Sequence, residues 1–152
     1  GLALAMHEPV GIIGILCSDQ APLLGMVSVL APAIAMGNTC VVVPSQAYPL
    51  AATDLYQVLE TSDLPAGVVN IVTAAHSDVV ETMAGHMEVD ALWYFGADGH
   101  SASIERASVT NLKRTWVNNG YSRDWQDTKQ GAGKEFLRQA TEVKNIWIPY
   151  GE

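Results

Sequence analysis

The feature that most constrains the fold of this sequence is a regular alternation of short apolar runs with longer helix-forming stretches. The apolar runs are rich in β-branched residues and lack polar alternation, which predicts strands buried on both faces. They comprise residues 10–16, 39–43, 68–72 and 91–95. Helices are expected between them at residues 22–36, at 51–59 and in a short segment that runs toward Gly85, where Asp78 and Glu81 resemble a capping box. The expected fold class is therefore α/β, a Rossmann-like parallel sheet with helices on both faces.

The pattern changes after Gly96. A helix is expected over residues 101–108, a strand over 112–117, an irregular segment over 118–133 and a helix over 135–141. A C-terminal strand at residues 143–149 has one solvent-facing side, as in an edge strand or a strand offered to a partner. We therefore expect a Rossmann-like domain at residues 1–105, followed by a C-terminal segment at residues 106–152 with this pairing strand.

The charge distribution is strongly asymmetric. All eight Lys and Arg residues lie at Arg106 or later, so residues 1–105 carry a charge of −11 and residues 106–152 carry +3. A nucleic-acid surface is excluded because phosphate binding needs clustered basic side chains. No apolar run approaches the roughly 20 residues that span a bilayer, and residues 1–6 do not resemble a signal peptide. With only two cysteines, a cytoplasmic location is expected, and the missing initiator Met suggests a piece of a longer protein.

Four separated stretches carry a resemblance to the cofactor domain of the aldehyde dehydrogenase superfamily. They are residues 8–14, 30–39, 64–72 and 86–90, in the family's order and spacing. The strand after Thr141 resembles the C-terminal end of these enzymes, where a strand takes part in subunit pairing. The segment at residues 91–96 is also similar to the shortened second copy at the C-terminus of aldehyde dehydrogenase family 16 proteins. The resemblance implies a cofactor domain of the aldehyde dehydrogenase type without the family's catalytic domain.

The motifs that carry catalysis in this family are missing. Active members take their nucleophilic Cys from a Gly-Gln-x-Cys context and their general base from a Glu-Leu-Gly-Gly stretch, and neither occurs here. Cys17 is expected in the core, and a disulfide with Cys40 is not expected because the two lie at opposite ends of parallel strands. The four histidines lack metal-ligand spacing and are expected at the surface or in turns. We therefore assign no catalytic residue and no metal site.

The cofactor-binding motifs are altered rather than absent. The resemblance places Gln20 where active members have an oxyanion-donating Asn, and residues 43–46 where they have a Lys-Pro-Ser-Glu run that holds the adenosine ribose. The vestigial cofactor-binding candidates are Gln20, Pro44, Ser45, Gln46, Gly96 and Ala97. Val43 removes the ammonium group, and Asp98 brings a carboxylate to the phosphate turn, where we expect it to cap the following helix itself. No cofactor is expected, and any NAD binding should be weak.

Three functional hypotheses follow. The first is a non-catalytic module, structural or protein-binding, of a larger aldehyde dehydrogenase family protein, whose partner is another protein or a preceding aldehyde dehydrogenase domain. The second is the NAD-binding part of an active enzyme that oxidises aldehydes to carboxylic acids, with the thiol supplied by another domain. The third is a pairing module that forms homo-oligomers or extends another domain's sheet through the C-terminal strand, with Trp147 as an anchor.

Overall fold

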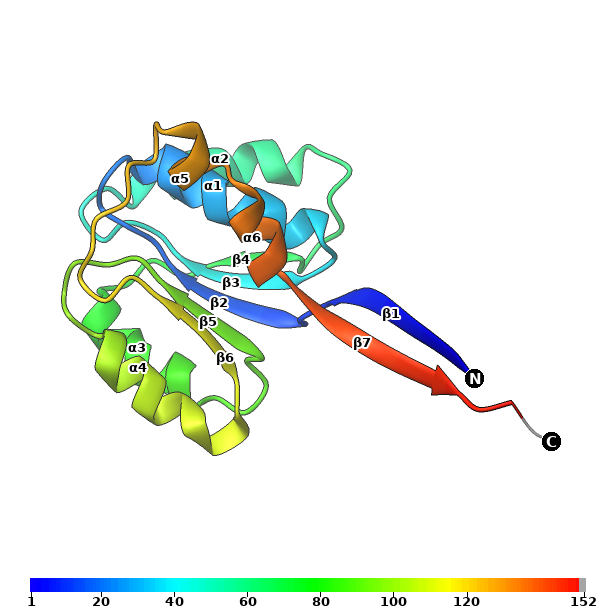
Figure 1. Ribbon diagram of the computed structural model, residues 1–152. Coiled ribbons are helices and arrows are strands. Elements are labelled where there is room, and N and C mark those ends of the chain that lie inside the picture. Colours follow the sequence, from blue (N-terminus) through cyan, green and yellow to red (C-terminus); the bar gives the residue numbers. More distant parts are fainter. Residues whose placement is uncertain (151–152) are drawn as a thin grey trace.

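The computed structural model describes residues 1–150, which form a five-stranded sheet between helices and a separate two-stranded ribbon (Figure 1). The strands of the sheet are β2 (Ile12–Leu16), β3 (Thr39–Val43), β4 (Val69–Ile71), β5 (Ala91–Tyr94) and β6 (Arg114–Val117). Their spatial order is β4-β3-β2-β5-β6, and all neighbours run parallel. The predicted α/β class with a Rossmann-like parallel sheet is confirmed.

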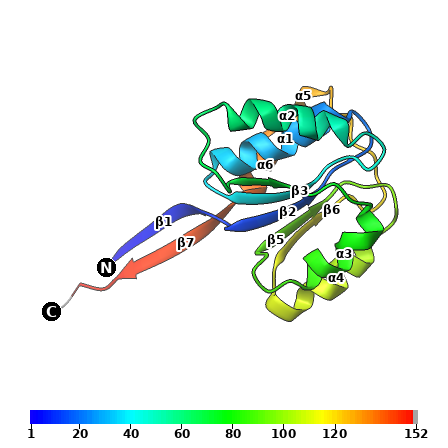
Figure 2. The ribbon, with the colours of Figure 1, turned by 180° about the vertical axis from the view of Figure 1, so that it is seen from behind.

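Helices cover both faces of the sheet (Figures 1 and 2). One layer contains α1 (Pro22–Ala35), α2 (Leu50–Glu60), α5 (Thr128–Gly131) and α6 (Lys134–Gln139). The other contains α3 (His76–Gly85), α4 (Ser101–Ala107) and the 3-10 turn η1 (Ser108–Asn111). Each layer has its own apolar core, because both faces of β2 and β5 are buried. This two-sided burial explains why these strands have no polar alternation in sequence.

The expected capping box at Asp78 is wrong. Helix α3 begins two residues earlier, at His76, and its N-cap Ala75 makes no side-chain hydrogen bond. The backbone N–H of His76 instead donates to Gln46 Oε1 at 3.1 Å. A side chain from a distant loop therefore satisfies a donor of the first helical turn, so no local capping residue is needed there.

The ribbon pairs β1 (Leu2–Pro9) with β7 (Thr141–Ile148) in antiparallel register from Leu2 opposite Ile148 to Pro9 opposite Thr141. It projects from the α/β body, and the N-terminus lies at its tip (Figures 1 and 2). The C-terminal strand was expected, whereas β1 was missed. Most of β1 is exposed, so burial imposes no pattern on its sequence; its partner strand, more than 130 residues away, provides its hydrogen bonds.

The chain after residue 105 contributes a strand to the sheet and a helix to the core. The expected division falls within α4, and β6 then joins the sheet beside β5. Phe136 of α6 is 1% exposed and belongs to the core cluster that contains α1. The segment expected to be irregular includes the short helix α5, which Asp127 caps by accepting hydrogen bonds from two backbone N–H groups. The division at residue 105 into separate units remains a prediction.

Candidate functional site

The carboxyl ends of the strands form the natural ligand edge of this sheet. The strand order reverses between β2 and β5, and in open α/β sheets the crevice at such a point is where ligands bind. A pocket of about 190 Å³ lies there, lined by residues of the loops after β2, β5 and β6. Gln20, Gly96 and Ala97 line this pocket, so three of the six sequence candidates lie at one site.

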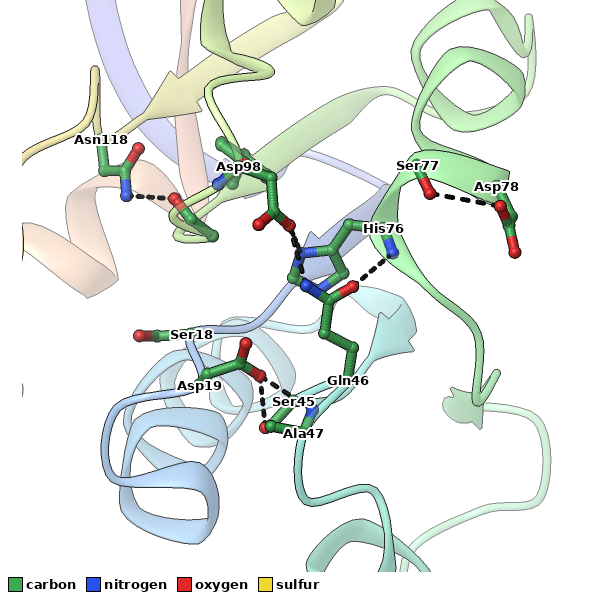
Figure 3. A network of polar contacts seen from close by, with 12 residues as sticks. Ser18, Asp19, Ser45, Gln46, Ala47, His76, Ser77, Asp78, Asp98 and Asn118 are labelled. Carbon is green, nitrogen blue, oxygen red and sulfur yellow. Dashed lines mark hydrogen bonds and ion pairs between the residues drawn. The ribbon is translucent and has the colours of Figure 1, made fainter.

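A polar network joins the loops at this edge (Figure 3). Ser45 Oγ donates to Asp19 Oδ1 at 2.5 Å, and the Ala47 N–H donates to the same oxygen at 3.2 Å. Gln46 Nε2 donates to Asp98 Oδ2 at 2.9 Å, while Gln46 Oε1 accepts from the His76 N–H. Ser45 and the preceding Pro44 are buried. Ser45 and Gln46 therefore bind neighbouring loops, and both ends of the Gln46 amide are occupied.

The expected role of Asp98 as a helix cap is wrong. Its carboxylate accepts from Gln46, and helix α4 has His100 at its N-cap without any side-chain cap bond. The backbone gives the reason: Gly99 has a φ of +75°, which turns the chain between Asp98 and the helix, and the Asp98 N–H donates to Tyr94 Oη at 3.1 Å. The carboxylate is thereby directed toward the loop after β3.

The sequence predicts His76 at the surface or in a turn, but the residue is only 1% exposed. Its Nδ1 lies 3.7 Å from Asp98 Oδ2, and its ring packs edge-on against Tyr94. Among residues 1–150, neither ring nitrogen has a hydrogen-bond partner of standard geometry. Burial lowers the pKa of His76, and the nearby Asp98 and Asp19 carboxylates oppose this without cancelling it. No local sequence signal distinguishes this histidine from the exposed ones.

The site carries two carboxyl groups. Partial burial pushes the pKa of Asp19 upward, but the hydrogen bonds from Ser45 and Ala47 and the nearby His76 bring it below its ordinary value. Asp19 is therefore ionised at neutral pH. Asp98 is 40% exposed at its side chain and close enough to His76 to interact with it. A ligand that approaches this edge thus meets negative charge on the loops after both β2 and β5.

Arg123 is the basic residue that lines the pocket, and its guanidinium group already contacts other groups of the protein. Its guanidinium carbon lies 5.2–6.0 Å from the centroids of four aromatic rings, those of Phe95, Trp116, Trp125 and Phe136. Its Nη1 also donates to the Gln130 carbonyl and to Glu135 Oε2, at 2.8 and 3.2 Å. Arg123 therefore fastens the segment after β6 to the aromatic core through cation–π contacts and hydrogen bonds.

Both cysteines lie in the core, as predicted for Cys17, and they are free thiols. Burial raises the pKa of each to about 12, so neither is a thiolate at neutral pH. In the described part of the chain, no group of three His, Cys, Asp or Glu residues could hold a metal ion. Among residues 1–150, no helix combines the length and apolar character that a bilayer crossing requires.

The buried histidine predicts a pH dependence of stability. Because the pKa of His76 is lowered by burial, the unfolded chain binds this proton more readily than the folded one. We therefore expect the free energy of unfolding to be fully retained above pH 7 and to decrease as the pH falls below 6.5, by at most about 1.4 kcal/mol per pH unit. Urea unfolding between pH 7.5 and 5 measures this slope. A His76→Phe variant should flatten it; equal slopes in both proteins would contradict the assignment.

A parallel sheet covered by helices on both faces, with a strand-order reversal at its centre, defines a Rossmann-like α/β domain. The model of the aldehyde dehydrogenase family matches residues 1–122. The chain therefore belongs to the aldehyde dehydrogenase family.

Known members of the family show the same relationship. The chain is 32% identical over 120 residues to the NADP/NAD-dependent aldehyde dehydrogenase PuuC of Escherichia coli (strain K12), covering 78% of this chain and 24% of that protein. It is 35% identical over 114 residues to 2-hydroxymuconic semialdehyde dehydrogenase of Pseudomonas putida, covering 74% of this chain and 24% of that protein. The chain thus spans about a quarter of the length of these relatives.

Solved structures of aldehyde dehydrogenases also resemble this chain in fold. Betaine aldehyde dehydrogenase from Staphylococcus aureus in complex with NAD+ superposes with a TM-score of 0.71 at 29% identity, over 76% of this chain and 23% of that one. Indole-3-acetaldehyde dehydrogenase in its apo form superposes with a TM-score of 0.74 at 30% identity, over 78% and 28% of the respective chains. The shared part contains the Rossmann-like cofactor domain.

Proposed function

We propose that this chain is a non-catalytic domain of the aldehyde dehydrogenase type, which serves as a structural or protein-interaction module of a larger family member. The observation that carries the proposal is the hydrogen bond between Gln46 and Asp98. It joins the loops after β3 and β5 across the edge where a dinucleotide would bind. The two buried, protonated thiols offer no nucleophile, which supports the same conclusion.

The residues at this edge do not fit NAD. The phosphate turn carries Asp98, and a pyrophosphate brought close to that carboxylate costs on the order of 1–4 kcal/mol per pair of like charges. Val43, at the position of the family's ribose-binding Lys, is fully buried in the core. Residues 1–105 contain no Lys or Arg that could compensate. We therefore propose that NAD binding is weak or absent, and we derive no reaction step through it.

Calorimetric titration with NAD+ and with NADH at pH 7 tests this proposal. We expect no saturable binding, whereas a dissociation constant below about 100 µM (roughly −5.5 kcal/mol) would overturn it and favour the NAD-binding part of an active enzyme. An Asp98→Ser variant measures how much the Asp98 carboxylate opposes nucleotide binding, because the substitution removes that carboxylate from an exposed turn. Steady formation of NADH from any aldehyde by the unmodified chain would contradict the non-catalytic role.

The likeness to the shortened C-terminal copy of family 16 proteins belongs to the same proposal. It is supported by the segment at residues 91–96 and by the short connection from β6 to β7. Sequencing the transcript upstream of the codon for Gly1 tests it. A complete aldehyde dehydrogenase domain with its Cys and Glu motifs is the expected finding, and an unrelated upstream domain would contradict it.

A second candidate function, pairing through the ribbon, is favoured by its exposed apolar side chains. Leu2, Leu4 and Ile148 share one face and are each 40–44% exposed, while Trp147 on the other face is 82% exposed. We expect light scattering to show a dimer or larger assembly of this chain. The alternative partner of the ribbon is a preceding aldehyde dehydrogenase domain. A Leu4→Ser, Trp147→Ser double variant should be monomeric. A monomeric unmodified chain, or a variant of unchanged mass, would count against homo-oligomeric pairing.

A further inference from the structure

We propose that the free edge of β4 is a docking site for an extended, Lys- or Arg-bearing segment of a partner protein, which adds to the sheet as a sixth strand. β4 ends the sheet, and within residues 1–150 it pairs with β3 alone. This surface is separate from the ribbon and from the pocket at the carboxyl edge. The proposal thus extends beyond the function proposed above, and nucleotide titrations do not bear on it.

The hydrogen-bonding groups of β4 are divided between its two edges. The Val68 carbonyl accepts from the Cys40 N–H at 2.8 Å, and the Val72 N–H donates to the Val42 carbonyl at 2.9 Å. Because backbone groups alternate sides along a strand, the N–H and C=O groups of Val69 and Ile71 face outward. These are the groups that an added strand would bond.

The edge of β4 lacks two common protections against strand addition, charged residues and Pro. Residues 68–72 contain no charged residue and no Pro, and four of the five are Val or Ile. The opposite edge strand β6, in contrast, begins with Arg114. Natural edge strands are commonly protected by short length, charges, Pro or bulges. β4 is short, at three residues, but its uncharged β-branched sequence places neither a charge nor a Pro against pairing.

A hollow of mixed polar and apolar lining beside β4 provides a place for a side chain of the added strand. It has a volume of about 200 Å³ and lies between α2 and the turn that leads into β4. Tyr56, Leu59, Leu64 and Val69 contribute to its lining, and Tyr56 is 46% exposed. Glu60 also lines it, which places a carboxylate next to the apolar surface. Strand addition with one anchored side chain is a known mode of peptide recognition.

The charge around this edge decides the chemistry of the partner. Glu60 lines the hollow, and Asp63 lies in the turn after α2, directly before Leu64 of the hollow's lining; both acidic residues are exposed. No Lys or Arg occurs anywhere in residues 1–105 to neutralise them. A segment with positive side chains beside its pairing residues would gain electrostatic complementarity, whereas an acidic one would be repelled. We therefore commit to a basic, extended partner segment.

Binding of two fluorescent nonapeptides, measured by anisotropy, tests the proposal. One alternates lysine with valine and the other alternates glutamate with valine. We expect the basic peptide to bind at least about tenfold more tightly than the acidic one, and its binding to weaken as salt is raised. Equal binding of the two peptides, or no binding of the basic one, would overturn the proposal.

Variants separate strand addition from simple charge attraction. Ile71→Pro removes an outward N–H that the sheet does not use, so we expect at least about tenfold weaker binding of the basic peptide, with Ile71→Val as the packing control. A Glu60→Gln, Asp63→Asn double variant should weaken binding about threefold, while Glu105→Gln on α4 should not. This double variant keeps the proposal testable if Ile71→Pro fails to fold, as judged by circular dichroism.

Three further results would overturn the proposal. The first is a folded Ile71→Pro variant that binds the basic peptide as well as the unmodified chain does. The second is unchanged binding by the double charge variant. The third is a dimer of the chain alone that dissociates in Ile71→Pro, because it would identify a second copy as the occupant of the β4 edge.

Discussion

Replacement of Asn38 by alanine is expected to lower the free energy of unfolding by about 3–5 kcal/mol. Asn38 is 2% exposed, and its Nδ2 donates to the carbonyls of Ala33 and Ala140 at 2.9 and 2.8 Å. Its Oδ1 accepts from the Gly11 N–H at 2.9 Å. The variant leaves the Ala140 carbonyl and the Gly11 N–H without this partner, each at a cost of about 1–3 kcal/mol where water cannot reach them. The Ala33 carbonyl keeps its second bond, from the backbone N–H of residue 38 at 3.2 Å. Urea unfolding followed by Trp fluorescence measures the loss.

The position of Asn38 explains why this effect is large. Gly11 follows β1 and Ala140 precedes β7, so one side chain ties the bases of both ribbon strands to the end of α1. An Asn70→Ala variant is the matched control, because Asn70 Nδ2 bonds the Gly67 carbonyl at an exposed position and makes only one further bond, to the Cys40 carbonyl at 3.3 Å. We expect it to cost no more than about 1 kcal/mol. Similar losses for both variants would contradict the role assigned to Asn38.

Replacement of Phe136 by alanine is expected to cost about 3–5 kcal/mol, because it removes a fully buried aromatic ring. Phe136 packs edge-on against Trp116, with ring centroids 5.3 Å apart, and it is one of the four rings around Arg123. The variant therefore loses apolar burial and weakens the attachment of the segment after β6. The unfolding midpoint in urea is the quantity to compare.

Leu137 provides the control for this second variant. It is the next residue in α6 and is 42% exposed, so Leu137→Ala should cost less than about 1 kcal/mol. Unfolding of Phe136→Ala should remain a single transition, because β6 and α6 share the core of the sheet. A variant whose main transition is unchanged would show that the segment after residue 105 folds independently.

The predictability of the elements depends on what covers them. The strand at residues 39–43 was predicted with its observed bounds, because both its faces are shielded by helices and its sequence is continuously apolar. Strand β1 was missed because most of it is exposed and its pairing partner lies at the far end of the chain. A strand that does not face a core, and that no turn residues precede, has little hydrophobic periodicity by which it could be predicted from sequence.

Prediction of the candidate site from sequence is limited in the same way, because it depends on contacts between distant parts of the chain. Gln46 and Asp98 were both recognised from the sequence as departures from the family's cofactor motifs. Their hydrogen bond to each other could not be predicted, because they are 52 residues apart and the bond depends on how two loops meet at the sheet edge. His76 was misplaced at the surface for a related reason, since its burial is produced by neighbouring loops and strands.

The sequence by itself determined the α/β class, the order of the main elements, the missing catalytic motifs and the absence of basic residues from residues 1–105. These properties follow from local composition and periodicity, which the chain carries wherever it folds. The tertiary structure alone decided that Asn38 ties both ribbon strands to α1, that Asp98 binds Gln46 rather than capping its own helix, and that β4 has an uncovered edge. These features depend on contacts between residues distant in sequence, and such contacts arise only when the strands are placed side by side.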